Sequence, residues 1–241
     1  MEGPSPRTVE VKTSPTAILF DAGGVIIYPD PVRVLPPLNE AGHFPTVDQL
    51  TRAHYYAMRA TEKDEDRHDW WLWYLKQYLI GAGVPESGAA DLAAHVAGSI
   101  DGFAWTYANP RAKDTLSALI GRGTPVGIVS NADGRVQEAL CQLRVCHVPG
   151  TEDDGCVTVG TVIDSAVVGV AKPNPEIFSY ALKDMKLQAD ANILYVGDTL
   201  KYDVAGARAA GLTPVHLDPF GDCSAPEGHL HIAAIADVLN L

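Results

Sequence analysis

The feature that most constrains the fold of this chain is a series of short apolar runs separated by helical patterns. The runs are short and buried-looking on both faces, which is typical of parallel strands covered by helices. They lie at residues 17–20, 126–129, 162–163, 193–196 and 214–217. Helical spacing separates them, at 111–122, 135–144, 175–186 and 202–210. We therefore predict an α/β fold with a Rossmann-like parallel sheet core and helices on both faces.

A segment of different residue composition interrupts this alternation of strands and helices after the first strand. Residues 31–105 have few β-branched runs, and they contain all four tryptophans of the chain. The aromatic residues Trp70, Trp73 and Tyr74 follow helical spacing, which favours a small helical core over a substrate platform. We predict a disordered tail over 1–14, a core formed by 15–30 and 106–241, and an inserted helical domain over 31–105.

Two further stretches carry weaker signals. Residues 148–160 are rich in glycine and acidic side chains and are predicted to form an outward loop. The tail from residue 228 onward is predicted to carry a last helix.

The composition excludes several classes of protein. Hydrophobic residues make up 46% and charged residues 20% of 241, which excludes a mainly disordered chain. The net charge of −12 argues against binding to a nucleic-acid backbone or an anionic membrane. No apolar run reaches the 18–20 residues that span a bilayer, and the first residues lack a secretory apolar region. We expect a cytoplasmic protein with no nucleic-acid or membrane partner.

The cysteines and histidines give no metal or redox pattern at this level. Cys141, Cys146, Cys156 and Cys223 form no CxxC pair, so we expect free thiols rather than a zinc or redox site. The histidines of the inserted segment do not have metal-ligand spacing either; they are His43, His54 and His68.

Polar side chains follow the predicted strands or open the next helix. They are Asp21, Ser130, Asn131, Lys172, Asp198 and Asp203. In an open α/β sheet, ligands bind beyond the carboxyl ends of the strands, so we expect these residues to converge. Carboxylates suit Mg²⁺, and a lysine supplies a point charge for phosphate. The pattern predicts a magnesium-assisted phosphate site.

Four segments, in this order and spacing, resemble the motifs of the haloacid dehalogenase (HAD) superfamily. They are residues 20–25, 128–131, 169–178 and 196–203, and the resemblance extends over about 15–219. It is to the members with an α-helical cap inserted after the first strand. The resemblance implies a hydrolase, with a Mg²⁺-dependent phosphatase acting on a small phosphorylated metabolite as the expected activity.

The same resemblance implies roles for individual residues around the phosphate. Asp21 would be the nucleophile that forms an aspartyl intermediate. Lys172 would neutralise the nucleophile and the phosphate. Ser130 and the backbone amide of Asn131 would hold the phosphoryl oxygens, with Gly24 also at the phosphate.

A metal set follows from the resemblance in the same way. Mg²⁺ would be bound by Asp21, by Asp198 and by the backbone carbonyl of Gly23. Asp203 would be an outer metal ligand or would orient Lys172.

One position departs from the family pattern of phosphatases. A second aspartate usually stands two residues after the nucleophile and acts as general acid and base, but this chain has Gly23 there. General acid–base help is worth typically about 10²–10⁴-fold in rate. The candidate substitutes are Asp30, His43, Asp133 or another residue of the inserted segment, and the sequence does not choose among them.

The glycine keeps two alternatives open. One is a binding or regulatory protein with weakened or lost catalysis. The other is cleavage of a carbon–halogen or carbon–phosphorus bond, for which a phosphonate hydrolase would need a cap lysine. The inserted segment offers Lys63 and Lys76, both in surroundings typical of a solvated surface. The sequence indicates neither the substrate nor the oligomeric state.

Overall fold

The computed structural model describes residues 14–63, 69–100, 104–151, 155–223 and 228–241. The chain forms two compact units. The larger comprises the chain up to Ile26 together with Asn109–Leu241, and the smaller comprises Ile27–Ala108. The predicted disordered tail lies, apart from Ser14, outside the described residues.

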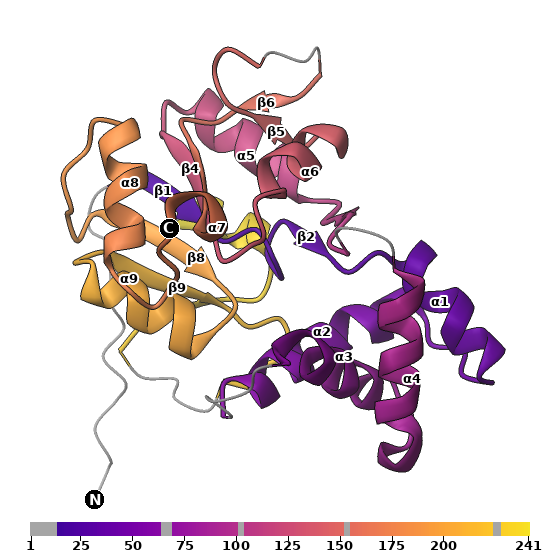
Figure 1. The fold of residues 1–241 in the computed structure, drawn as a ribbon. Helices are drawn as coiled ribbons and strands as arrows, with labels where there is room; N and C mark the ends of the chain where they lie inside the picture. Colours follow the sequence, from indigo (N-terminus) through magenta and orange to yellow (C-terminus); the bar gives the residue numbers. More distant parts are fainter. Residues whose placement is uncertain (1–13, 64–68, 101–103, 152–154, 224–227) are drawn as a thin grey trace, which may run out of the picture. The chain divides into compact units, whose positions relative to one another are not determined.

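The larger unit is built on a six-stranded sheet in which all paired neighbours run parallel (Figure 1). The strand order is β10-β9-β8-β1-β4-β7. The strands are β1 (Ala17–Phe20), β4 (Val126–Ser130), β7 (Val162–Asp164), β8 (Ile193–Gly197), β9 (Thr213–Leu217) and β10 (Leu230–Ile232). This confirms the predicted α/β class with a Rossmann-like parallel sheet.

Helical segments lie between these strands and after the last of them. They are α5 (Ala112–Gly121), α6 (Val136–Gln142), α7 (Ser165–Val168), α8 (Glu176–Asp184), η1 (Leu200–Val204), α9 (Ala205–Ala209) and η2 (Ile235–Asn240). Alternate strand residues such as Leu19, Val129 and Tyr195 form one buried cluster with Phe178 of α8 and Ala207 of α9. Burial of this apolar face fixes α8 and α9 against the strands that carry the polar residues.

Two stretches differ from their predicted structure. Part of the expected loop over 148–160 forms β6 (Val157–Thr158), which pairs in parallel with β5 (Cys146–His147). The expected last helix is preceded by β10, which extends the main sheet beyond β9, and the final turns are a 3₁₀ helix, η2. Both missed strands have only two or three residues, so their alternation is too short to register as a periodic pattern.

The smaller unit is helical, with one short antiparallel pair. Its elements are β2 (Ile27–Tyr28), α1 (Pro31–Glu40), α2 (Val47–Thr61), α3 (Trp70–Gly81), α4 (Glu86–Ser99) and β3 (Tyr107–Ala108). Tyr74 and Tyr78 of α3 are buried in a core of their own, against which Trp71 and Trp105 pack. His54 Nδ1 lies 2.8 Å from the hydroxyl of Tyr74.

These packing contacts make most of the aromatic side chains structural, although Trp70 remains 39% exposed. None of the helices in the described part of the chain combines the length and apolar character that crossing a bilayer requires.

Candidate active site

The register of the central strands brings two aspartates to one edge of the sheet. Phe20, the last residue of β1, pairs with Ile128 of β4 and with Val196 of β8. Asp21 follows immediately, and its N–H donates to the Val196 carbonyl over 2.8 Å. Asp198 follows the end of β8. Both side chains therefore lie at the carboxyl edge, as the strand-end argument predicts.

Lys172 reaches this edge from the segment before α8 and is almost completely buried. Its Nζ lies 2.9 Å from Asp21 Oδ2 and 2.7 Å from Asp203 Oδ1, and it donates to the Tyr195 hydroxyl over 2.8 Å. The Asn131 side chain holds the Lys172 backbone, since its Oδ1 accepts from the Lys172 N–H and its Nδ2 donates to the Lys172 carbonyl. The end of β4 thus positions the lysine as well as carrying Ser130.

The carboxylate of Asp203 is fully engaged with its neighbours. Its Oδ2 accepts from the Thr199 N–H over 2.9 Å and from the Thr199 hydroxyl over 2.6 Å. Its Oδ1 accepts from Lys172 and, over 3.1 Å, from the Tyr195 hydroxyl. These contacts depend on η1, a π-helical turn capped by Thr199, which brings Asp203 back beneath the end of β8.

The absence of a side chain at Gly197, directly before Asp198, has a steric reason. A Cβ atom on Gly197 would lie 2.3 Å from both Cβ and Cγ of Asp203, so a larger residue would displace that carboxylate. Gly24, at φ +73°, has the left-handed backbone that a turn with glycine provides.

Burial and charge set the protonation of the site. Burial, together with the carboxylates of Asp203 and Asp198, outweighs the attraction of Lys172 and raises the pKa of Asp21 to about 7. Burial acts to lower the pKa of Lys172, but Asp203 and Asp21 outweigh it and the pKa is raised. Burial opposes ionisation of Asp203, yet Lys172 and the hydrogen bonds from Thr199 hold its pKa below the usual value.

The carboxylates fit a divalent cation. One oxygen from each of Asp21, Asp198 and Asp203 lies within 4.8 Å of the others, and all three residues are buried. Lys172 contacts both Asp21 and Asp203, so these two carboxylates share a single ammonium group. Hard oxygen ligands of this kind suit Mg²⁺.

Ser130 ends β4 and is buried, and the loop after it is held by residues that the sequence analysis missed. Asp164, at the end of β7, accepts from the Gly134 N–H over 2.9 Å. The Ser165 hydroxyl accepts from the Ala132 N–H and donates to the Ala132 carbonyl, both over 3.1 Å. These contacts fix the backbone that follows Asn131.

Sequence signals existed for the missed residues. Tyr195 places a hydroxyl in the middle of an otherwise apolar strand, where a buried phenol needs a partner. Thr199 stands directly before a helix, at a capping position. Asp164 directly follows the strand predicted at 162–163, as Asp21 and Asp198 follow theirs, and in the structure it is the last residue of β7.

The three residues named as candidate substitutes for the missing general acid and base lie in different surroundings. Asp133 is exposed and pairs with the Arg135 guanidinium. Asp30 caps α1, where it accepts from the Val32 N–H over 2.9 Å and from the Thr106 hydroxyl over 3.0 Å. Asp30 and His43 both belong to the smaller unit.

Comparison with known proteins gives consistent relatives. A ribulose-1,5-bisphosphate 5-phosphatase from Halopiger xanaduensis is 28% identical over 233 residues, which cover 88% of each chain. A glyceraldehyde 3-phosphate phosphatase from Methanopyrus kandleri is 32% identical over 116 residues, 48% of this chain and 45% of that protein.

A solved structure shares the fold. The putative HAD-hydrolase YfnB from Bacillus subtilis, which was bound to magnesium, matches with a TM-score of 0.60 and 19% identity, over 95% of this chain and 98% of that one. The family model of haloacid dehalogenase-like hydrolases matches residues 15–211. With this match over most of its length, the chain belongs to the haloacid dehalogenase-like hydrolases and is a hydrolase.

Proposed function

We propose that this hydrolase is a Mg²⁺-dependent phosphatase that acts on a small phosphorylated metabolite through an aspartyl-phosphate at Asp21. The observation that carries the proposal is the buried Asp21 carboxylate, 2.9 Å from the Lys172 ammonium and within reach of two further carboxylates. The names of the Halopiger and Methanopyrus relatives, both phosphatases of small sugar or triose phosphates, support it.

In the proposed reaction, a carboxylate oxygen of Asp21 attacks phosphorus, and a phosphorus–oxygen bond forms as the bond to the leaving group breaks. The leaving oxygen takes the electron pair of the broken bond. Water then attacks the same phosphorus, releasing inorganic phosphate and the Asp21 carboxylate. Because only the ionised carboxylate attacks, the raised pKa of Asp21 makes this step sensitive to pH near neutrality.

Lys172 is proposed to balance the charge of the nucleophile and of the phosphoryl oxygens. Ser130, the backbone N–H of Asn131 and Gly24 are proposed to bind those oxygens. The anchoring of the Lys172 backbone by the Asn131 side chain supports this division, because it holds the lysine beside the end of β4.

Asp21, Asp198 and the carbonyl of Gly23 are the proposed Mg²⁺ ligands. When bound, the ion neutralises charge on the transferring phosphoryl group. Asp203 is proposed to orient Lys172 rather than to bind the ion, since both its oxygens already accept hydrogen bonds.

The glycine at position 23 sets the expected leaving group. With no carboxyl there to protonate the departing oxygen, acyl and aryl phosphates should react faster than simple alkyl phosphates. The helical unit is the proposed cap, whose side chains would select the organic part of the substrate.

The test is hydrolysis of acetyl phosphate and of an activated aryl phosphate, with and without Mg²⁺. Asp21→Asn should abolish turnover, whereas Asp114→Asn, which changes an exposed carboxylate on α5 of the same unit, should keep it. Metal-dependent turnover lost only in Asp21→Asn would establish the nucleophile. Mg²⁺ binding without turnover on either compound would overturn the phosphatase and favour a binding module.

A second panel addresses the substrate. Ribulose 1,5-bisphosphate and glyceraldehyde 3-phosphate, named for the relatives, should be compared with the acyl phosphate at equal concentration. Turnover of a sugar phosphate above the acyl phosphate would indicate that a group of the protein or substrate replaces the missing acid.

Carbon–phosphorus cleavage lacks support from the lysines of the helical unit. Lys76 lies 3.6 Å from Glu86 and over the Trp73 ring, and Lys63 is exposed, as the sequence analysis predicted for a solvated surface. The cytoplasmic location stays a prediction from the sequence.

A further inference from the structure

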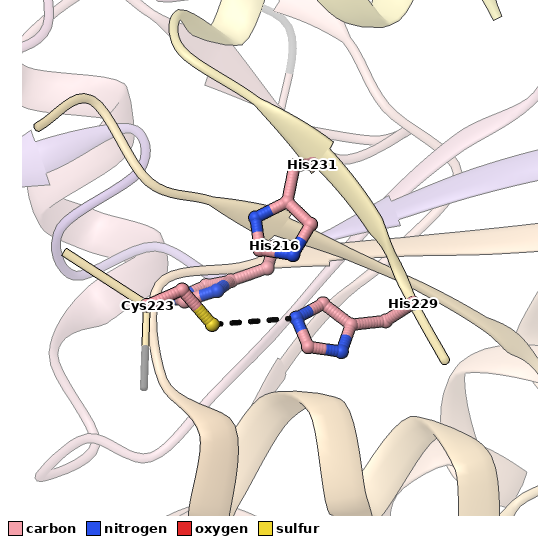
Figure 2. Close-up of side chains that lie close together, drawn as sticks. All are labelled: His216, Cys223, His229 and His231. Carbon is pink, nitrogen blue, oxygen red and sulfur yellow. Dashed lines mark hydrogen bonds between the residues drawn. The ribbon is translucent and has the colours of Figure 1, made fainter. Parts of the chain in front are cut away.

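A second group of potential metal ligands lies at the edge of the main sheet, in the same unit as the candidate active site. It consists of His216, Cys223, His229 and His231, which we call the His₃Cys cluster (Figure 2). One ligand atom from each of the four residues lies within 4.8 Å of the other three. Three imidazoles and one thiol from the stretch 216–231 therefore converge on one small volume.

The sheet itself assembles the three histidines. His216 of β9 pairs directly with His231 of β10, and paired residues of parallel strands point to the same face. His229 stands two residues before His231, so it returns to that face as well. The ring centroids are 5.5 Å apart for His216 and His229, 5.4 Å for His216 and His231, and 4.4 Å for His229 and His231.

A structured turn presents the cysteine to the histidines. The Asp218 carboxylate accepts from the N–H of Asp222 over 2.9 Å and from that of Cys223 over 3.0 Å. The Asp218 N–H in turn donates to the Ile232 carbonyl of β10 over 2.9 Å. On the other side of the cluster, Arg208 donates to the carbonyl of Gly228, next to His229, over 2.9 Å.

The separation of sulfur and nitrogen matches that of two ligands on one tetrahedral ion. Cys223 Sγ lies 3.7 Å from His229 Nε2. Typical zinc–sulfur and zinc–nitrogen distances place two such ligands about 3.6 Å apart at the tetrahedral angle. The same separation also permits a weak S–H···N hydrogen bond, so it does not by itself identify an ion.

The surroundings of His216 favour a shared metal ion over a simple hydrogen bond. Its side chain is buried, at 6% exposed, and its Nδ1 has no hydrogen-bond partner in the part of the chain that the structure describes. Its Nε2 lies 3.2 Å from the carbonyl oxygen of Asp198. An Nε2–H donor to that carbonyl leaves the Nδ1 lone pair for a ligand, as in metal-binding histidines whose other nitrogen is anchored.

We propose that the His₃Cys cluster is a zinc site of structural type. Nitrogen and thiolate ligands select zinc over magnesium, so the site is distinct from the carboxylate cluster around Asp21. Four protein ligands leave no open position for a reacting group, which makes the site a clamp between β9, the turn at Cys223 and β10. Partial exposure of Cys223 and His231 gives the ion a path to the cluster.

The first test measures metal in the full-length protein. After equilibration with slightly more than one equivalent of zinc in excess Mg²⁺, and removal of unbound metal, the wild type should retain about one zinc per chain. Cobalt in place of zinc should give the intense visible bands of a tetrahedral ion and a near-ultraviolet thiolate-to-cobalt charge-transfer band. The candidate active site has no thiolate, so this band distinguishes cobalt bound through cysteine from cobalt bound at the carboxylate cluster.

Cysteine variants identify the thiolate that produces the charge-transfer band. Cys223→Ser should lose the charge-transfer band, and Cys141→Ser, a thiol outside the cluster, should keep it. Asp218→Asn, which weakens the support of the turn, should lower zinc affinity by about 10–100-fold while the band remains at saturating metal.

Zinc at about a thousandfold excess over its dissociation constant should raise the wild-type melting temperature by roughly 10 °C. Absence of retained zinc in the wild type, or a charge-transfer band that survives Cys223→Ser, would overturn the proposal. The wild-type stoichiometry decides the matter even if a variant fails to fold.

Discussion

Replacing Asp21 with asparagine should stabilise the metal-free protein while abolishing its activity. Asp21 is buried among Asp198, Asp203 and Lys172, and its pKa is raised from 3.8 to about 7. A carboxyl with a raised pKa binds more protons in the folded than in the unfolded state. Folding stability therefore falls as the pH rises from 3.8 to about 7, and then stays level. Asparagine removes this titration and keeps the shape of the side chain.

The magnitude follows from the two pKa values. Each pKa unit corresponds to about 1.4 kcal/mol, so the ionised Asp21 carboxylate costs up to about 4 kcal/mol of folding free energy at pH 8. At pH 5, only the interval from 3.8 to 5 contributes, and the cost is roughly 2 kcal/mol. For a chain of this length, about 2–4 °C per kcal/mol predicts a gain in melting temperature of roughly 8–16 °C at pH 8.

The assay is thermal unfolding of wild type and Asp21→Asn in a chelating buffer between pH 5 and pH 8. The gain should grow with pH up to about 7 and then level off. Asp133→Asn removes an exposed carboxylate, and its melting temperature should stay near that of the wild type at each pH. A gain for Asp21→Asn that is absent at pH 8, or equal at pH 5 and pH 8, would refute this account of the site.

Three further perturbations follow from the same contacts. Gly197→Ala should cost about 1–3 kcal/mol of stability and most of the activity, because its Cβ would lie 2.3 Å from Asp203. The matched control in thermal unfolding and turnover is Gly121→Ala, which has open space around the new Cβ. Tyr195→Phe removes the hydroxyl that contacts both the Val129 carbonyl and Lys172, and should lower the free energy of unfolding by about 1–3 kcal/mol in denaturant titrations. A change below about 0.5 kcal/mol would contradict this prediction. The apparent Mg²⁺ affinity should fall about tenfold from pH 6 to pH 5, measured by calorimetry, because protons compete for Asp21; a pH-independent affinity would exclude Asp21 as a ligand.

The second cluster shows where sequence reasoning stopped short. The spacings of the cysteines gave no reason to expect zinc, since no two form a CxxC pair. The proposed ligands instead combine Cys223 with His216 of β9 and His231 of β10, which are neighbours only because the two strands pair. β10 is a three-residue strand with no periodic signal, so the pairing that creates the cluster was not predictable from the pattern.

At the candidate active site, the sequence by itself determined that Asp21 and Asp198 would meet. Short apolar strands must run parallel under helices, and parallel strands end at one edge, so Asp21 and Asp198 had to share that edge. The order and spacing of the four motifs also indicated the family.

Only the tertiary structure decided how those residues are held and charged. The π-helical turn η1 and the missing Cβ of Gly197 let Asp203 reach Thr199 and Lys172, and the Tyr195 hydroxyl joins them from the middle of a strand. The pKa of Asp21 depends on burial and on charges that come from distant parts of the chain. Such quantities depend on three-dimensional distances, which a local pattern of residues does not specify.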